Sequence, residues 1–394
     1  MRNDYDILIV GSGFSGSIMA RELAESNNQK VLIIEQRSHI AGNMYDEIDE
    51  NGILVQKYGP HFFNTDKYWI VEYLERFAEL VPHCVKLLAY IDCKYVRLPY
   101  NYETVQQIMP PTQAERLLAL FRSAFLGRDR VPIFELIECE NSDIRAYGEL
   151  LFEKAYRPYV AKQWGLSPDE IDRSVLNRVP MAMNYDERYL NTDFQRLPKH
   201  GYTKLFDSIL NYPNIDIRLN TDALEHITLE ESTGNVLYDG VSYKKVIYTG
   251  AIDELFNECY GSLPYRSLDI RYSVKKKENA LPADVVSYPQ ADGYTRSTEY
   301  RKICQYPLKT PFTVIATEYP LEYKRNADVG NLPYYPIIND SNLDVYKRYF
   351  CKSEKYKNLL LCGRLAEYKY FNMDAVIEST FEKLSILRKE LKLV

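Results

Sequence analysis

Residues 5–35 alternate apolar and polar stretches in the order expected of a β-α-β unit. Residues 5–10 form an apolar run of buried-strand length, residues 18–25 have helical periodicity, and residues 31–34 form a second apolar run. Between the first run and the helix, residues 11–16 read GSGFSG and match G-x-G-x-x-G. This order predicts a Rossmann-like α/β domain that begins with the first strand.

The three glycines have distinct roles in a dinucleotide-binding turn. Gly11 permits the tight turn, Gly13 lets the backbone approach a pyrophosphate, and Gly16 lets the helix pack closely on the strand. The free N–H groups of the helix start favour phosphates. Glu35, which ends the second strand, is placed to accept hydrogen bonds from an adenosine ribose. The motif does not distinguish FAD from NAD, and its plain alternative is a glycine turn without a ligand.

The pattern changes several times after the first unit. A helical pattern at residues 69–80 precedes a hairpin pattern at 85–99, and helical periodicity then dominates residues 101–180. Residues 268–318 alternate as strands of an antiparallel sheet, and a long helix is expected over 375–391. We therefore expect an α/β fold: a Rossmann-like FAD-binding domain with a helical insertion domain and an antiparallel β-sheet domain.

The same pattern predicts discontinuous domains. The FAD-binding domain is assigned residues 1–82, 200–262 and 327–394; the helical domain 100–185; and the sheet domain 83–99, 186–199 and 263–326. The polar, punctuated stretch at about 166–178 within the helical domain is expected to be a mobile lid, with a plain connection as the alternative.

Composition and charge narrow the function classes. The 394 residues carry a net charge of −6, which argues against a nucleic-acid partner. Seven scattered cysteines without C-x-x-C, and five histidines without ligand spacing, predict reduced thiols, no metal site and a cytoplasmic protein. No apolar run reaches membrane-spanning length, and no leader is expected ahead of the first strand. Tyrosine is abundant, at 35 residues, and suits base stacking and sugar hydroxyls.

Short motifs follow one another along nearly the whole chain. They are GSGFSG at 11–16, GN at 42–43, GPH at 59–61, KQWG at 162–165, RVP at 178–180, NYD at 184–186, PKHGY at 198–202, YTRSTE at 294–299, PYYP at 333–336, GR at 363–364 and YFNMD at 370–374. In order and spacing they resemble the motifs of the UDP-galactopyranose mutases. A second G-x-G-x-x-G, as in two-nucleotide reductases, is absent from the sequence.

The resemblance implies FAD and a reaction without net redox change. Enzymes of this family interconvert the six- and five-membered ring forms of galactose attached to UDP. The flavin must be reduced, so an external reductant is expected; its N5 attacks the anomeric carbon and displaces UDP, and the adduct opens through an iminium and recloses. A nucleotide-sugar substrate and a homodimer are expected partners.

The resemblance also assigns residues. Arg178, on the expected lid, and Arg296 would hold the diphosphate, because guanidinium groups bind phosphate through two parallel hydrogen bonds. His61, on the loop after Gly59-Pro60, would lie beside the flavin, although such a histidine by itself is more often structural. The expected substrate-binding residues are Tyr156, Tyr159, Trp164, Tyr189, Tyr319 and Tyr370. The expected cofactor-binding residues are Gly11, Gly13, Phe14, Ser15, Glu35, Gln36, Asn43, Tyr58, Gly59, Arg364, Asn372 and Met373.

The sequence departs from the family pattern around the expected substrate. Asn64, Val85, Ala155, Val160 and Asn372 stand where relatives commonly carry other residues. These changes leave the sugar and the base open, so a mutase of dTDP-fucopyranose or UDP-N-acetylgalactosamine is an alternative. Further alternatives are an FAD oxidoreductase of the amine-oxidase type and a binding protein without catalysis.

Overall fold

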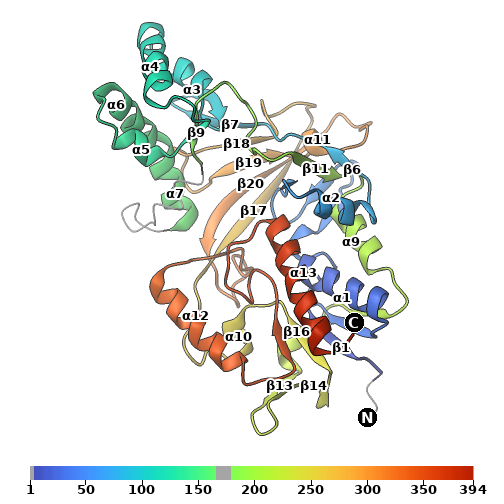
Figure 1. The fold of residues 1–394 in the computed structure, drawn as a ribbon. Helices are drawn as coiled ribbons and strands as arrows, with labels where there is room; N and C mark the ends of the chain where they lie inside the picture. The colour runs from blue at the N-terminus through green and yellow to red at the C-terminus, as the bar shows by residue number, and fades with distance from the viewer. Residues whose placement is uncertain (1–3, 166–178, 394) are drawn as a thin grey trace.

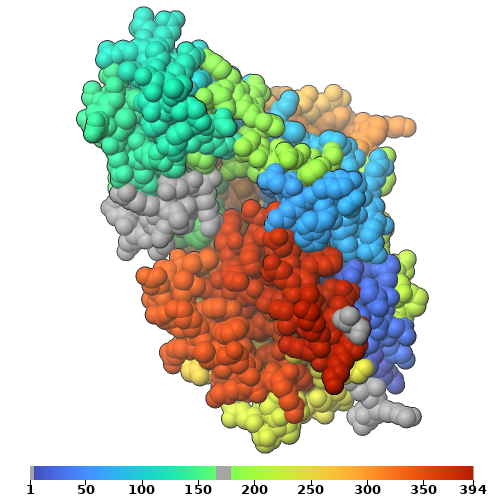
Figure 2. Space-filling model, viewed as in Figure 1, coloured from blue at the N-terminus to red at the C-terminus, as the bar shows by residue number. Residues whose placement is uncertain are grey.

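The computed structural model describes residues 4–165 and 179–393. The molecule is elongated, with an α/β body at one end and a helical unit at the other (Figure 1). Long strands of a seven-stranded sheet run between the two. Figure 2 shows the helical unit (teal and green) projecting beyond the surface formed by α12 and α13 (orange and red).

The α/β body contains a five-stranded parallel sheet. Its order is β12 (Ile215–Arg218), β2 (Val31–Ile34), β1 (Ile7–Val10), β16 (Lys245–Tyr248) and β22 (Leu359–Leu361). One face packs against α1 (Phe14–Asn27) and α13 (Met373–Glu390), and the other against α10 (Ile252–Leu255) and α12 (Asp340–Ser353). Burial of both faces explains the continuous apolar runs of these strands.

The seven-stranded sheet joins distant parts of the chain. Its order is β21 (Tyr335–Pro336), β17 (Tyr265–Lys275), β20 (Thr313–Glu322), β19 (Arg296–Glu299), β18 (Val285–Ser287), β7 (Leu87–Ile91) and β8 (Lys94–Leu98). The expectation of a wholly antiparallel sheet is wrong at one pair, because β18 and β7 run parallel. A long crossover separates them in sequence, and only a tight hairpin would require antiparallel pairing.

A smaller, three-stranded sheet brings together strands from early in the chain and the strand that ends at residue 198. In it, β11 (Phe194–Pro198) pairs with both β5 (Phe63–Thr65) and β6 (Leu80–Pro82). The helix expected over 69–80 is α2 (Tyr68–Glu75) and ends early, because Leu80 pairs with Pro198 as a strand residue.

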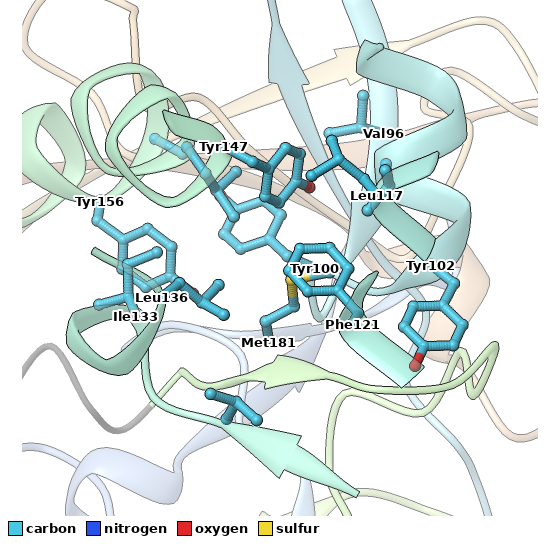
Figure 3. Packing of buried hydrophobic residues seen from close by; sticks show 14 of the residues in the cluster. Val96, Tyr100, Tyr102, Leu117, Phe121, Ile133, Leu136, Tyr147, Tyr156 and Met181 are labelled. Carbon is cyan, nitrogen blue, oxygen red and sulfur yellow. The ribbon is translucent and has the colours of Figure 1, made fainter. Parts of the chain in front are cut away.

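The helical unit has its own core. Its helices are α3 (Tyr102–Ile108), α4 (Pro111–Ala124), α5 (Ile133–Ile137), α6 (Ser142–Leu151) and α7 (Arg157–Trp164). A π-helical turn, η2 (Phe152–Tyr156), separates α6 from α7, where the sequence pattern predicts one uninterrupted helix. Figure 3 shows Tyr156 beside Ile133 and Leu136 in this core.

The remaining elements are short or peripheral. They are η1 (Gly42–Met44), β3 (Asp46–Ile48), β4 (Leu54–Gln56), β9 (Arg130–Val131), β10 (Met181–Ala182), α9 (Tyr202–Leu210), η4 (Ala223–Glu225), β13 (Ile227–Glu230), β14 (Asn235–Tyr238), β15 (Val241–Ser242) and α11 (Tyr300–Ile303). All seven cysteines are free thiols. Within residues 4–165 and 179–393, the helices are too short or too polar to span a membrane. The same residues contain no group of three or more His, Cys, Asp or Glu side chains that could hold a metal ion.

Candidate active site

A cavity of about 840 Å³ opens beside the carboxyl ends of β1, β2 and β16, where α/β sheets bind their ligands. The start of α13 and strand β19 also line it. Every residue expected to bind the cofactor lines this cavity: Gly11, Gly13, Phe14, Ser15, Glu35, Gln36, Asn43, Tyr58, Gly59, Arg364, Asn372 and Met373. His61, Arg296 and Tyr370 line it as well.

Two of the three glycines in the turn are closely packed, and the third borders open space. Gly11 has φ +98°, and a Cβ there would lie 2.1 Å from Thr249 Oγ1. A Cβ on Gly16 would lie 2.0 Å from the carbonyl oxygen of Gly11. At Gly13, a Cβ would meet no described atom within 4 Å. The missing side chain therefore leaves the first N–H groups of α1 accessible from the cavity.

Glu35 and Arg37 form a connected pair at the same end. The Glu35 carboxylate accepts from Ser12 N at 2.9 Å and from Ser12 Oγ at 2.7 Å, and its other oxygen accepts from Arg37 N at 3.0 Å. Arg37 Nη2 donates to Asn43 Oδ1 at 2.9 Å, and its guanidinium lies 4.4 Å from the Tyr58 ring centroid. Arg37 Nε and Nη1 are buried without a partner among the described residues. Arg37 is not among the cofactor-binding residues assigned from the sequence, although the loop at 36–43 shows two basic side chains close to where phosphates would lie.

His61 also lines the cavity, and its imidazole is neutral. Its backbone N–H donates to Gln56 Oε1, and its carbonyl accepts from the Tyr202 hydroxyl at 3.1 Å. Burial, together with the positive charges of Arg364 and Arg296, lowers the pKa of His61 to about 3. Nδ1 is buried and lacks a partner within the described part of the chain. A ligand polar atom can therefore bond to this nitrogen.

Arg296 is the cation beside His61. Its Nε donates to Glu318 Oε1 at 2.7 Å across the β19–β20 pair. Burial acts to lower the pKa of Arg296, but the Glu318 carboxylate together with Tyr159 and Tyr335 outweighs burial and holds that pKa well above its usual value. With Nε engaged, the terminal guanidinium nitrogens are the atoms that can bind a diphosphate.

Aromatic rings surround Arg296. The rings of Tyr335 and Tyr370 stack with centroids 5.7 Å apart, and Arg364 lies 5.7 Å from the Tyr335 centroid. Trp164, from the end of α7, lies 6.5 Å from Tyr335. Tyr335 is not among the site residues expected from the sequence, although it lies within the PYYP motif.

Tyr319, expected at the diphosphate, lies on the opposite face of the sheet. Successive strand residues point to opposite faces, and Glu318 already points toward Arg296 and the cavity. The Tyr319 ring instead lies 4.0 Å from the guanidinium of the exposed Arg271. The sheet register thus separates Tyr319 from the cavity.

The other expected substrate residues are distributed around the helical unit. Tyr156 is buried in the core of that unit, and its hydroxyl donates to the carbonyl of Val179. Tyr159, one turn later on α7, has its pKa raised by burial, and the positive charge of Arg296 partly offsets that rise. Tyr189 lines a second cavity of about 310 Å³ that shares Asn64 with the first. Arg178 lies outside the described residues, so its meeting with Arg296 stays a prediction.

Comparison with known proteins fits this arrangement. Residues 154–370 match the family model of UDP-galactopyranose mutase, and residues 9–77 match an NAD(P)-binding Rossmann-like domain. A UDP-galactopyranose mutase of Mycoplasma genitalium is 35% identical over 387 residues, which cover 97% of this chain and 94% of that protein. The chain belongs to the UDP-galactopyranose mutase family. It is therefore an isomerase by family, and the resemblance inferred from its motifs is confirmed.

Further relatives of this UDP-galactopyranose mutase family member bear on its substrate and fold. A dTDP-fucopyranose mutase of Escherichia coli is also 35% identical and covers 95% of this chain and 96% of its own length. A solved structure of a reduced UDP-galactopyranose mutase superposes with a TM-score of 0.70 at 15% identity, covering all of this chain and 95% of that one. A putrescine oxidase superposes at 0.56 and 12% identity, over 98% of this chain and 99% of that one. These superpositions confirm the Rossmann-like α/β fold class.

Proposed function

We propose that the protein interconverts UDP-galactopyranose and UDP-galactofuranose without net oxidation or reduction, with reduced FAD in the main cavity. The observation that carries this proposal is one cavity with two ends of different chemistry. Gly13 and the start of α1 line one end, and the part-buried Arg296 lines the other beside Tyr335 and Tyr370. The first end suits a dinucleotide and the second suits the diphosphate of a nucleotide sugar.

The residues present fit FAD. The open space at Gly13 and the start of α1 suit the pyrophosphate. Arg37 and His61 carry buried nitrogens that lack partners among the described residues, and a polar ligand would satisfy them. Asn372 and Met373 begin the 18-residue helix α13 at the cavity wall. Its N-terminus would favour negative charge on a reduced ring system, by about 0.3–1 kcal/mol or more when partly buried.

The chain's own residues would control the sugar chemistry by position and charge. A reduced flavin bound here supplies a nucleophilic nitrogen, N5, for the anomeric carbon of the sugar. Arg296 would retain the departing UDP within the cavity, and Glu318 fixes the orientation of that guanidinium. His61, neutral because its pKa is lowered to about 3, would form a hydrogen bond without adding charge. An external reductant would prime the cofactor, and we propose a cytoplasmic homodimer.

The conversion of dTDP-fucopyranose is the second candidate. Val85 is buried, at 3% exposure, and offers no hydrogen bond to a sugar hydroxyl. Val85 lines neither described cavity, so this candidate rests on the similarity to the dTDP-fucopyranose mutase. The 35% identity to the Escherichia coli enzyme is the same as that to the Mycoplasma genitalium one, so identity does not choose between these substrates.

One experiment tests both candidates. The purified protein is reduced with dithionite and incubated separately with UDP-galactopyranose and dTDP-fucopyranose, and the products are separated by chromatography. We expect a furanose product from the UDP sugar, with no stoichiometric consumption of reductant. Conversion of the dTDP sugar alone would select the second candidate. Stoichiometric consumption of dioxygen or of an acceptor without ring isomerisation would contradict both.

A further inference from the structure

The ammonium group of Lys162, on α7, forms three hydrogen bonds to a loop of the seven-stranded sheet. Its Nζ donates to the backbone carbonyl oxygens of Tyr288 at 2.7 Å, Ala291 at 2.6 Å and Tyr294 at 2.9 Å. A lysine ammonium has three donors and no acceptor, so all of its hydrogen-bonding capacity is engaged. Although burial lowers the pKa of Lys162 to about 8, the group remains mostly protonated at neutral pH.

The three carbonyls belong to the loop between β18 and β19. This loop turns through Gly293, which has φ +79°, and leads directly into Arg296. Just before Arg296, Thr295 N donates to the carbonyl of Glu318 at 3.0 Å. The ammonium of Lys162 therefore holds the backbone immediately ahead of the cavity arginine.

A second cation holds the end of the same helix. From β17, Arg266 Nε donates to the carbonyl of Gln163 at 2.9 Å, and Nη2 donates to the carbonyl of Lys162 at 3.2 Å. These are among the last carbonyls of α7, which have no partner within the helix. Gly165 follows in the left-handed region at φ +64°, and a Cβ there would lie 2.6 Å from Arg266 Nη1.

The helix held in this way also carries aromatic residues of the site. α7 carries Tyr159 and Trp164, and the Trp164 ring lies 6.5 Å from the Tyr335 ring, centroid to centroid. The positive charge of Arg296 acts to lower the pKa of Tyr159. A nucleoside diphosphate needs an aromatic surface for its base and a cation for its phosphates. In this protein α7 carries the aromatic side chains and β19 carries the cation, so the distance between them depends on how α7 is attached to the sheet.

We propose that Lys162 and Arg266 are positioning residues that set the spacing between the aromatic side chains of α7 and the guanidinium of Arg296, and thereby the affinity for the nucleotide part of the substrate. This inference rests on the proposed function for its ligand. The attachment itself is independent of that function, because its donors and acceptors all lie within the chain.

The test replaces Lys162 with Met, which keeps most of the side-chain length and removes every donor. The chain has two tryptophans, so a Trp69→Phe background makes Trp164 the fluorescent reporter of UDP binding. We expect Lys162→Met to raise the dissociation constant of UDP at least about tenfold, the size expected when hydrogen bonds from a charged group are lost. The dissociation constant of Lys162→Arg for UDP should lie between those of the unsubstituted protein and of Lys162→Met, since a planar guanidinium cannot direct three donors at these carbonyls.

Lys154→Met is the matched control. Lys154 lies on η2, is exposed and pairs with Asp92 at the surface, so its loss should leave UDP affinity unchanged. FAD content and the melting temperature of each variant show whether the protein is folded. Hydrogen exchange of residues 288–295, measured without nucleotide, should quicken in Lys162→Met and not in Lys154→Met.

The outcomes separate this inference from the proposed function. Unchanged exchange in residues 288–295 of folded Lys162→Met overturns the attachment, whatever the protein catalyses. Faster exchange with unchanged UDP affinity shows that Lys162 is merely structural and overturns its positioning role. If the unsubstituted protein neither binds UDP nor isomerises its sugar, the proposed function fails, and the exchange result still stands on its own.

Discussion

Arg296 and Glu318 face each other across neighbouring strands, with Nε of the guanidinium 2.7 Å from Oε1 of the carboxylate. Glu318 is 1% exposed and Arg296 lines the cavity. A buried charge that loses its partner typically costs about 3–5 kcal/mol. The pair therefore links the stability of the folded chain to the cation that the ligand would meet.

Glu318→Gln should lower the free energy of unfolding by about 3 kcal/mol, because the part-buried Arg296 would keep its charge and lose its carboxylate partner. UDP should restore more stability to this variant than to the unsubstituted protein, since a diphosphate would supply the missing negative charge. Denaturant unfolding with and without UDP measures both effects. Glu322→Gln, an exposed position on the same strand paired with Lys324, is the control and should show neither. Equal stabilisation by UDP in all three proteins would contradict this coupling between the ion pair and the ligand.

Arg296→Ala should reduce kcat/KM by about two to three orders of magnitude while FAD content is retained, because in the proposed function Arg296 would contact the substrate's diphosphate and not the cofactor's adenosine end. Steady-state kinetics and the visible absorption spectrum measure the two quantities. Arg271→Ala is the control, since Arg271 is exposed and stacks on Tyr319. Arg178→Ala should behave like Arg296→Ala if the resemblance assigns it correctly. Near-normal turnover in Arg296→Ala would remove the proposed diphosphate role.

Tyr335→Ala and Tyr319→Ala should differ sharply. Tyr335 lines the cavity, stacked on Tyr370, and its loss should raise KM about tenfold, the scale of one lost aromatic contact. Tyr319 lies on the other face of the sheet, so its replacement should change KM by less than about twofold. Initial rates over a range of UDP-galactopyranose concentrations decide the matter. A larger effect at Tyr319 would mean that the face assignment is wrong.

His61 should make the protein less stable as the pH falls. Its pKa is about 3 in the folded chain and about 6.5 in an unfolded one, so between these values only the unfolded state binds the proton. Stability contributed by neutral His61 is thus fully present above about pH 6.5 and is lost as the pH falls toward 3. Urea unfolding at several pH values, compared with His61→Gln, measures it. As the pH falls, the free energy of unfolding of the unsubstituted protein should decrease relative to that of His61→Gln. Parallel curves of free energy of unfolding against pH for the two proteins would rule this out.

The nucleotide-binding half of the site could be predicted from local sequence because its parts are local. A glycine turn, the helix start beside it and the following strand lie within residues 7–35, and their geometry depends on neighbours in the chain. Gly11 and Gly16 occupy positions where a Cβ would collide, as their place in the motif indicates. The motif alone therefore predicts the roles of Gly11 and Gly16 in the turn and in helix packing.

The substrate half depends on pairings that the sequence does not show. Whether Tyr319 or Glu318 meets the cavity residue Arg296 is decided by the register of β19 with β20, and a single-residue change of register would exchange the two faces. The burial of Tyr156 in the core of the helical unit accompanies a π-helical turn, which α7 with Tyr159 follows. Helical periodicity alone predicts an uninterrupted helix through this region.

The parallel pairing of β7 with β18 also constrains how the protein is made. Leu87 pairs with Val285, and the edge strand at the other end of the sheet from this hairpin is Tyr335–Pro336. On the ribosome, the hairpin at Leu87–Leu98 must wait with one edge unpaired until some two hundred further residues have emerged. Pairings over such sequence distances are slow to form, and an unpaired edge is a place where nascent chains associate wrongly.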